Sequence, residues 1–238
     1  MLREQKAVVA MSGGQDSTTC LAWAIDKYGA ENVHAVTFDY GQRHRVEMYA
    51  AMTICRKWRI PQMVLSVPAF EQLGAAALTN ESIDVNVDAA GTGNDYAEAA
   101  GLPSTFVPGR NLIFLGLVAA FAVQHGIGNI VTGVCYSDEA GYPDCRPEFI
   151  ETFEQVARVA MGNDDLTIHA PLLYLSKGAT FSMAEALGVL STIIVETHTC
   201  YNGVRDTLHP WGRGCGTCGA CIERADGFAE FKNRVVAS

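Results

Sequence analysis

The chain has 238 residues, of which 49% are hydrophobic and 18% charged, and its formal net charge is −9. A chain of this length and composition buries roughly 70–75% of its unfolded surface, which excludes a disordered protein and a small domain that depends on disulfides. The acidic balance argues against nucleic acid as a partner, because tight binding to phosphate backbones depends on lysine and arginine. The longest apolar stretch, 112–123, is too short to cross a bilayer, and no secretory signal is recognisable. We therefore expect a cytoplasmic protein with no membrane partner.

Strand-like and helical patterns alternate along the chain. Apolar runs predict strands at 6–11, 33–38, 62–67, 129–134 and 166–170. Apolar residues at helical spacing predict helices at 18–28, at 45–58, from Asn111 onward, at 147–161 and at 176–187. This order predicts an α/β fold with a doubly wound, mainly parallel, Rossmann-like sheet covered by helices on both faces. Ligands of such sheets bind at the carboxyl ends of the strands.

The chain divides into two parts on this interpretation. Residues 1–196 form the α/β domain, with an irregular excursion at 68–108 that is rich in Gly, Asn, Asp and Ala. Residues 197–238 are rich in cysteine and are interpreted as a metal-binding tail packed on that domain.

The first predicted strand leads into a polar glycine loop, 12–17, with the sequence Ser-Gly-Gly-Gln-Asp-Ser. Paired glycines let backbone N–H groups approach an anion, and the helix start that follows adds further donors. Ser12 and Ser17 can donate hydroxyl hydrogen bonds, and Asp16 can cap the helix or hold a metal ion. The chain has no Gly-Lys pair and therefore no Walker loop, and Asp16 breaks the dinucleotide fingerprint. The loop predicts a phosphate site of another kind, with a ligand-free turn as the alternative.

Four cysteines near the C-terminus have the spacing of metal ligands. Cys215, Cys218 and Cys221 form two successive C-x2-C steps, and Cys200 supplies a fourth thiolate. Four thiolates suit a closed, tetrahedral and therefore structural zinc site. An iron–sulfur cluster takes the same ligands, but the ferredoxin pattern needs a further Cys-Pro that does not follow Cys221. We favour zinc.

The other four cysteines are interpreted separately. Cys20 and Cys55 fall on predicted helices and are expected to be core thiols. Cys135 and Cys145 flank a loop that follows a predicted strand and therefore faces the expected site. We favour packing for this pair over a catalytic persulfide.

The loop 12–17 resembles the PP-loop signature of the ATP pyrophosphatase superfamily. That resemblance implies cleavage of ATP between the α and β phosphates, with adenylation of a substrate oxygen and release of pyrophosphate. It also implies the adenine nucleotide alpha-hydrolase-like form of the Rossmann-like fold.

Five further segments narrow the resemblance. They read Phe-Asp-Tyr-Gly-Gln-Arg-His at 38–44, Phe-Val-Pro-Gly-Arg-Asn at 106–111, Thr-Gly-Val at 132–134, Gly-Tyr-Pro-Asp-Cys-Arg at 141–146 and Thr-Cys-Tyr-Asn-Gly at 199–203. Together with the loop they resemble the 7-cyano-7-deazaguanine synthase family over essentially the whole chain. One departure is the interval 204–214, which is longer than expected and contains His209, an alternative metal ligand that we favour less.

The resemblance implies an ATP-dependent ligase that converts 7-carboxy-7-deazaguanine and ammonia to the nitrile in queuosine biosynthesis. It implies Mg²⁺ with ATP, one structural Zn²⁺ per chain, and a homodimer. The residues that it assigns to ATP are Met11, Ser12, Gly13, Gly14, Gln15, Asp16, Ser17, Thr18, Asp39 and Gly133.

Each assigned side chain has an ordinary alternative. Asp16 places Mg²⁺ or caps the helix, and Lys177 binds phosphate or is an exposed lysine. Arg110 binds the α-phosphate or the substrate carboxylate, or forms an ordinary salt bridge. Asp39 contacts ribose or adenine, or caps a loop.

The deazapurine is assigned to Asp138, Asp144 and Arg146, since the guanine-like edge of the substrate needs an acceptor. Two other functions remain open. One is a tRNA thiolase that attacks an adenylated base with a cysteine persulfide. The other is a non-catalytic module that binds adenine nucleotide.

Overall fold

The computed structural model describes the chain over 5–42, 44–73, 77–79, 101–102, 105–136 and 142–237. The residues between these ranges are not discussed. Part of the predicted excursion at 68–108 therefore lies outside the described residues, and so does Asp138.

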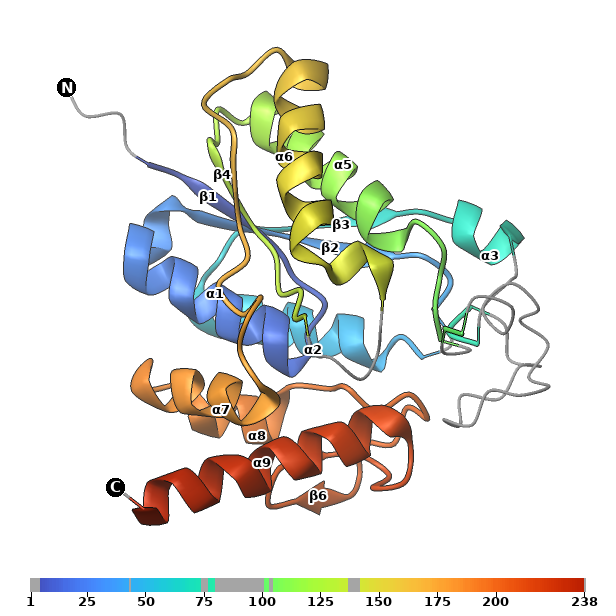
Figure 1. Cartoon of the computed structure of the whole chain (residues 1–238), viewed down its shortest axis with the longest axis vertical. Coiled ribbons are helices and arrows are strands. Elements are labelled where there is room, and N and C mark those ends of the chain that lie inside the picture. Colours follow the sequence, from blue (N-terminus) through green and yellow to red (C-terminus); the bar gives the residue numbers. More distant parts are fainter. Residues whose placement is uncertain are drawn as a thin grey trace.

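Five parallel strands form the central sheet (Figure 1). In chain order they are β1 (Ala7–Ala10), β2 (Val33–Asp39), β3 (Gln62–Ser66), β4 (Asn129–Val131) and β5 (Thr167–His169). Their order across the sheet is β3-β2-β1-β4-β5, and every pairing is parallel. This confirms the predicted doubly wound α/β fold.

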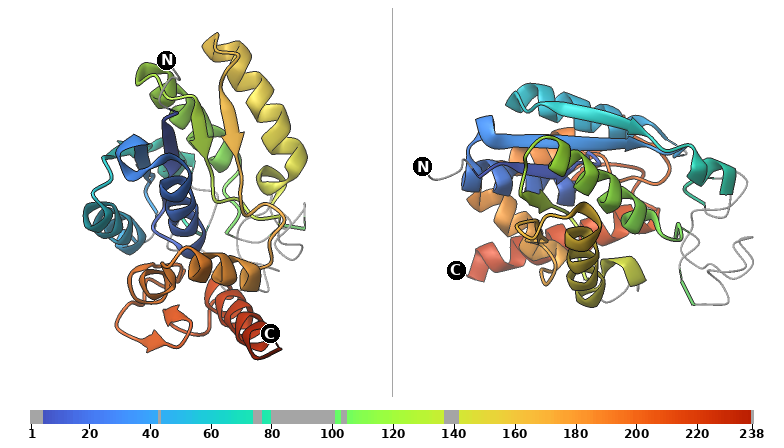
Figure 2. Two further views of the ribbon diagram at one scale, coloured as in Figure 1. Left: turned by 90° about the vertical axis from the view of Figure 1, so that its left-hand side faces the viewer. Right: turned by 90° about the horizontal axis from the view of Figure 1, so that it is seen from above.

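The helices of the described residues pack on both faces of the sheet and beside it. They are α1 (Gln15–Tyr28), α2 (Val46–Trp58), α3 (Ala69–Leu73), α5 (Arg110–Gln124), α6 (Pro147–Met161), α7 (Lys177–Ala186), α8 (Leu190–Glu196) and α9 (Gly219–Ala237). Short 3-10 turns occupy Ala30–Asn32 and Pro143–Cys145. Figure 2 shows α5 and α6 on one side of the sheet and α1 and α2 on the other.

Strand β1 shows why both faces are covered. Its side chains alternate across the sheet, since successive residues of a strand point to opposite faces. Val8 packs into the cluster formed with α5 and α6, whereas Ala7 and Val9 pack into the cluster formed with α1 and α2. All three residues are fully buried. A strand that is apolar on both faces requires a layer of helices on each.

The C-terminal helices form a further layer beside α1, at the bottom of Figure 1. Helix α9 packs against α7 around Phe181 and Phe231. The two helices approach closely because glycines face the contact: a Cβ on Gly227 would lie 2.6 Å from the Cβ of Lys177, and one on Gly178 would lie 2.4 Å from the carboxylate of Glu230. This approach brings the cysteine-rich segment next to the sheet.

Several boundaries differ from the sequence expectations. Helix α1 begins at Gln15 rather than at Thr18, so half of the polar loop forms its first turn. Strand β4 ends three residues earlier than expected, at Val131. Helices α8 and α9 and a small hairpin, β6 (Leu208–His209) and β7 (Gly212–Arg213), were not predicted.

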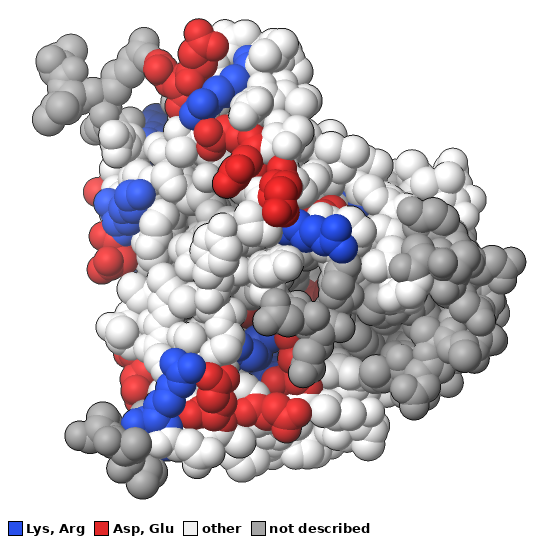
Figure 3. All heavy atoms as spheres, viewed as in Figure 1, with Lys and Arg blue, Asp and Glu red and all other residues white. Residues whose placement is uncertain are grey.

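Charges of both signs share the face drawn in Figure 3. Acidic side chains form rows over α6 and α9, with lysine and arginine side chains between them. No helix of the described residues combines the length and the apolar character that crossing a bilayer requires.

Candidate functional site

The loop 12–17 leaves the carboxyl end of β1, in the middle of the sheet, and enters α1. Gly13 has φ +91°, and a Cβ there would lie 2.2 Å from the carbonyl oxygen of Glu47 and 2.6 Å from the amide nitrogen of Ala51. Only glycine therefore allows the start of α2 to lie against the loop. Gly133, just after β4, approaches the same loop: a Cβ there would lie 2.9 Å from the nitrogen of Ser17.

Two serine hydroxyls organise the loop from inside. The N–H groups of Ser12 and Gly13 both donate to Oγ of Ser17, each at 3.2 Å. The Ser17 hydroxyl donates in turn to the carbonyl of Gly14 at 3.3 Å, and the N–H of Gly14 donates to Oγ of Ser12 at 3.3 Å. These hydrogen bonds gather the three N–H groups at the positive end of α1, where a phosphate oxygen would replace the serine oxygens as their acceptor. Binding of ATP by these residues stays a prediction.

Buried polar groups without hydrogen-bond partners gather in the first turn of α1. Gln15 is 1% exposed, and neither atom of its carboxamide has a partner among the described residues. The same holds for Oγ1 of Thr18 and Oδ1 of Asp16. Such groups cost about 1–3 kcal/mol each when unpaired, and they are a common feature of functional sites. Met11, by contrast, belongs to the core below the loop.

Asp16 and Lys177 meet beside the loop. Nζ of Lys177, the first residue of α7, lies 2.8 Å from Oδ2 of Asp16 and 3.4 Å from Oε1 of Glu223. Burial lowers the pKa of Lys177, but the two carboxylates outweigh it and raise the pKa above its ordinary value. Lys177 is therefore not an exposed lysine. It is a fixed cation that carries its charge at neutral pH, directly beside the expected phosphates.

Glu223 was missed by sequence reasoning. It lies on α9, two residues after Cys221, and the cysteine spacing marks the helix start but not its path toward the loop. No local signal in the sequence places its carboxylate on Lys177.

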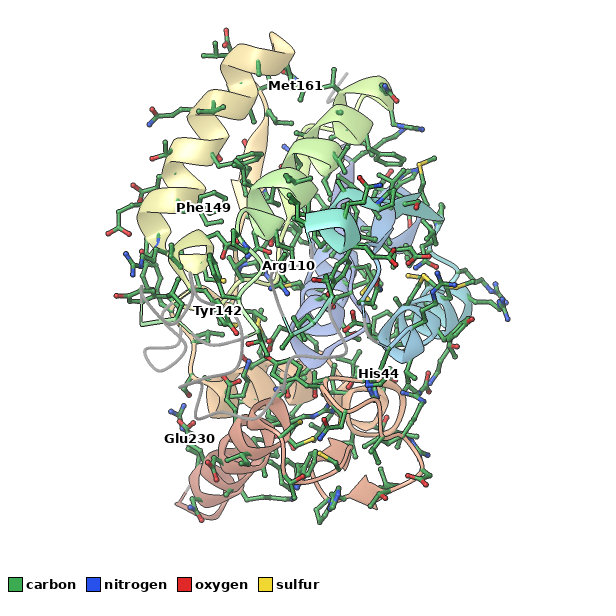
Figure 4. The ribbon with its side chains drawn as sticks, turned by 90° about the vertical axis from the view of Figure 1, so that its right-hand side faces the viewer. His44, Arg110, Tyr142, Phe149, Met161 and Glu230 are labelled. Carbon is green, nitrogen blue, oxygen red and sulfur yellow. The ribbon has the colours of Figure 1, made fainter. Side chains whose placement is uncertain are left out.

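Arg110 begins α5 at the same end of the sheet (Figure 4). Burial lowers the pKa of its guanidinium, whereas Tyr40, Tyr142 and Asp144 raise it, so Arg110 remains charged. Among the described residues no carboxylate lies within ion-pair distance of Arg110. A cation surrounded by tyrosines suits an anionic ligand group.

Glu47, in the first turn of α2, is the second residue that sequence reasoning missed. Burial raises the pKa of its carboxyl group to about 7, although the charge of Arg110 and a hydrogen bond with Tyr40 act in the opposite direction. Its proton occupancy therefore changes near neutral pH. Glu47 lies three residues after His44, the last residue of the segment 38–44, and no local sequence pattern predicts a buried carboxyl group at this position.

Tyr201 has charged neighbours from both groups of site residues. Burial raises the pKa of its hydroxyl, and its electrostatic neighbours include Arg110 and Tyr142 as well as Lys177 and Glu223. Arg110 and Lys177 are therefore both within electrostatic range of the Tyr201 hydroxyl.

The remaining candidates have more ordinary surroundings. Asp39 ends β2, and one carboxylate oxygen lies 3.4 Å from Arg45. Asp144 accepts a hydrogen bond at 3.1 Å from the N–H of Asn111 and so caps the first turn of α5. Arg146 is exposed at the start of α6.

The four predicted metal ligands lie together. Their sulfur atoms are all within 4.8 Å of one another; Cys215 and Cys221 are 3.9 Å apart, and Cys200 and Cys218 are 4.0 Å apart. A tetrahedron with metal–sulfur bonds of about 2.3 Å has edges of about 3.8 Å, so the four thiols fit a single ion. The N–H of Cys218 donates to Sγ of Cys215 and supports that ligand.

His209 lies outside this group, and its interpretation as an alternative ligand is wrong. Its Nε2 lies 3.1 Å from the carbonyl oxygen of Gly214, and its ring stacks on Trp211 at 4.4 Å. The long interval 204–214 folds into the hairpin of β6 and β7, which holds the histidine away from the sulfur atoms.

The other cysteines are thiols rather than thiolates. Cys20 and Cys55 belong to the core between the sheet and α1 and α2, as predicted. Burial raises the pKa of Cys145 to about 11. For Cys135, burial and the charge of Asp16 raise the pKa further above its ordinary value.

Comparison with known proteins identifies the family. The family model described as "Queuosine biosynthesis protein QueC" matches residues 6–232. The chain belongs to the QueC family. A relative from Chromobacterium violaceum, named 7-cyano-7-deazaguanine synthase, is 46% identical over 95% of this chain and 90% of its own length. Relatives of the same name from Wolinella succinogenes and Clostridium acetobutylicum are 42% and 43% identical; each alignment covers 97% of this chain, and 95% and 96% of the relatives. The resemblance to the 7-cyano-7-deazaguanine synthase family, drawn from the six motifs, is thereby confirmed.

Proposed function

We propose that the chain is a 7-cyano-7-deazaguanine synthase: an ATP-dependent ligase that converts 7-carboxy-7-deazaguanine and ammonia to the nitrile in queuosine biosynthesis. One observation carries the proposal. In a member of the QueC family, the complete Ser-Gly-Gly-Gln-Asp-Ser loop lies beside the partly buried Lys177–Asp16 ion pair.

The chemistry requires an activated carboxylate. An oxygen of the substrate carboxylate attacks the α-phosphorus of ATP, the bond to the bridging oxygen breaks, and pyrophosphate leaves with the electron pair. Ammonia then attacks the acyl carbon, AMP leaves, and a proton is released as the amide forms. A second ATP-dependent activation of the amide oxygen lets that oxygen depart with loss of two protons from nitrogen, which gives the nitrile. The protein contributes positioning and charge neutralisation.

Each part of the site has a role in this scheme. The loop N–H groups and the Ser12 and Ser17 hydroxyls hold the β and γ phosphates. Asp16, whose Oδ1 has no hydrogen-bond partner among the described residues, would hold the Mg²⁺ that accompanies ATP, and Lys177 neutralises the charge that develops on the departing pyrophosphate. Arg110 orients the substrate carboxylate. The assignments of Asp39 and Gly133 to adenosine, and of Asp144 to the deazapurine, remain part of the proposal; the contact of Asp144 with α5 limits its freedom to accept from a ligand.

We assign zinc to the four-cysteine centre. Four thiolates at the separations found here hold one ion with no open position, which makes the site structural. A cubane cluster interposes iron and sulfide between its cysteines and needs them farther apart. The centre would anchor residues 197–238 as a tail on the α/β domain of residues 1–196.

The tRNA thiolase alternative depends on Cys135 or Cys145 acting as a nucleophile. A persulfide mechanism needs a thiolate of low pKa. Burial raises the pKa of both thiols instead. We therefore propose ammonia rather than sulfur as the incoming group, and no nucleic acid as partner.

The proposed localisation and oligomeric state follow from the cysteine centre and from exposed apolar side chains. We propose a cytoplasmic protein, because a four-thiolate centre requires reduced cysteines. We also propose a homodimer, which the exposed apolar side chains of Leu112 and Ile113 on α5 favour.

The function is tested by incubating the zinc-loaded protein with MgATP, ammonium and 7-carboxy-7-deazaguanine. We expect the nitrile by mass spectrometry and AMP in amounts that depend on the acid. Asp16→Asn should abolish both products, whereas Asp26→Asn, at the far end of the same helix, should retain them. AMP formation that does not require the acid, or sulfur transfer to tRNA, would contradict the proposal.

A further inference from the structure

The segment 197–199 lies directly against the phosphate loop. It connects the end of α8 to Cys200, the first metal ligand. The N–H of His198 donates to the carbonyl of Gly13 at 2.9 Å. The methyl group of Thr199 faces Gly14, where an added Cβ would lie 3.2 Å from it. Movement of this segment would therefore move both glycines of the loop.

A single buried side chain fixes the segment from behind. Arg224 is 1% exposed, and its guanidinium donates to Oγ1 of Thr199 at 3.1 Å and to Oγ1 of Thr197 at 2.9 Å. It also donates to the carbonyl of Ile193 at 2.7 Å and to that of Trp211 at 3.0 Å. The guanidinium thus joins the C-terminal half of α8, the segment 197–199 and the hairpin.

Arg224 makes these contacts without a carboxylate. Burial lowers its pKa to about 10, so the group is still charged at neutral pH. A buried cation whose hydrogen-bond partners are all neutral is tolerated only while those hydrogen bonds are satisfied. The positions of its four acceptors are therefore tightly coupled to one another.

The position of Arg224 is set by the cysteine centre. It lies three residues after Cys221 on α9, which places the two on the same side of the helix. Trp211, one of its acceptors, packs against Cys200, Cys218 and Cys221.

We propose that Arg224 is a positioning residue that couples the four-cysteine centre to nucleotide binding. It holds segment 197–199 through the hydroxyls of Thr197 and Thr199, so that the hydrogen bond from His198 keeps Gly13 in the conformation that receives phosphate. The metal centre, which contributes no group to the reaction, thereby sets the affinity of the loop for ATP. This inference rests on the proposed nucleotide-binding role of the loop.

The first test compares two arginines of the same region. Arg224→Lys keeps the charge but cannot reach four acceptors, and we expect the ATP dissociation constant, measured by calorimetry without acid substrate, to rise about tenfold or more. Arg213→Lys is the matched control. Arg213 donates to the carbonyls of Val195 and Arg205 and to none of residues 197–199, so its variant should bind ATP within twofold of the wild type. Metal content and the unfolding transition are measured for each protein.

The second test separates coupling from simple packing at Thr199. Thr199→Val keeps the methyl group on Gly14 and removes the hydroxyl that accepts from Arg224; Thr199→Ser does the reverse. Coupling through Arg224 predicts at least threefold weaker ATP binding for the valine variant, and near-normal binding for the serine variant, with one metal ion per chain in both. A purely packing role predicts the opposite order.

Every outcome of the two tests either supports or overturns the proposed coupling through Arg224. Wild-type affinity in Thr199→Val, or equal losses in Arg224→Lys and Arg213→Lys, would overturn the coupling and leave the proposed ligase intact. If Arg224→Lys loses its metal or fails to fold, the Thr199 pair decides alone. A wild-type protein that does not bind ATP would refute both the coupling and the proposed function.

Discussion

The carboxyl group of Glu47 makes protein stability depend on pH in a defined way. Burial raises its pKa to about 7 in the folded state, from 4.5 for an ordinary glutamate. The folded protein therefore binds this proton more tightly than the unfolded chain does. The resulting stabilisation is complete below about pH 4.5 and is lost as the pH rises through 7.

The structure sets the magnitude. When the proton-binding difference is integrated from pH 5 to pH 8.5, this pKa shift lowers the free energy of unfolding of the wild type by about 2.5 kcal/mol. Glu47→Gln removes the titration. The stability of the variant relative to the wild type should therefore rise by about this amount between pH 5 and pH 8.5, as an upper limit for a half-buried group.

Urea unfolding at four pH values, with metal present throughout, measures this difference. Glu151→Gln, an exposed position on α6, is the control and should show no such trend. A constant difference between Glu47→Gln and the wild type at every pH would refute the reasoning, because it would mean that Glu47 titrates normally in the folded state.

Three further predictions concern the loop and its neighbours. Gly13→Ala should destabilise the protein by about 3 kcal/mol or more in thermal or urea unfolding, since its Cβ would overlap α2 at positive φ; Gly14→Ala, at φ −78°, should cost about 1 kcal/mol. Lys177→Met should lower kcat by roughly 10²–10³ in the AMP-release assay, and Glu223→Gln, which leaves the Asp16 pair intact, should cost about tenfold or less. A strong thiol-competent chelator should release one metal ion per chain and lower the melting temperature; release of iron together with sulfide would contradict the zinc assignment.

Local sequence patterns predict much of the fold. Helix α6 matches its expected bounds because Pro147 suits a first helical turn and Gly162, at φ 61°, ends the helix in the left-handed conformation. The phosphate loop and the four cysteines were likewise predictable, because closely spaced residues of distinctive chemistry carry each of them.

The contacts that complete the site depend on packing between distant segments. Helix α9 has two glycines within it and a mixed polar sequence, so propensity does not favour it; it forms against α7, where Gly178 and Gly227 permit a close approach. That packing brings Glu223 to Lys177 across 46 positions of the chain. Glu47 reaches the site for a similar reason, since Gly13 lets α2 begin against the loop. Pairings of this kind leave no periodic signal in the sequence.

The central claim is that a carboxylate of 7-carboxy-7-deazaguanine is adenylated at this loop. The most direct test uses the acid labelled with oxygen-18 in its carboxylate, with MgATP and ammonium, and reads the isotope content of the products by mass spectrometry. Attack on the α-phosphorus predicts that labelled oxygen appears in AMP as the nitrile accumulates. Nitrile formed with AMP free of label would contradict the account.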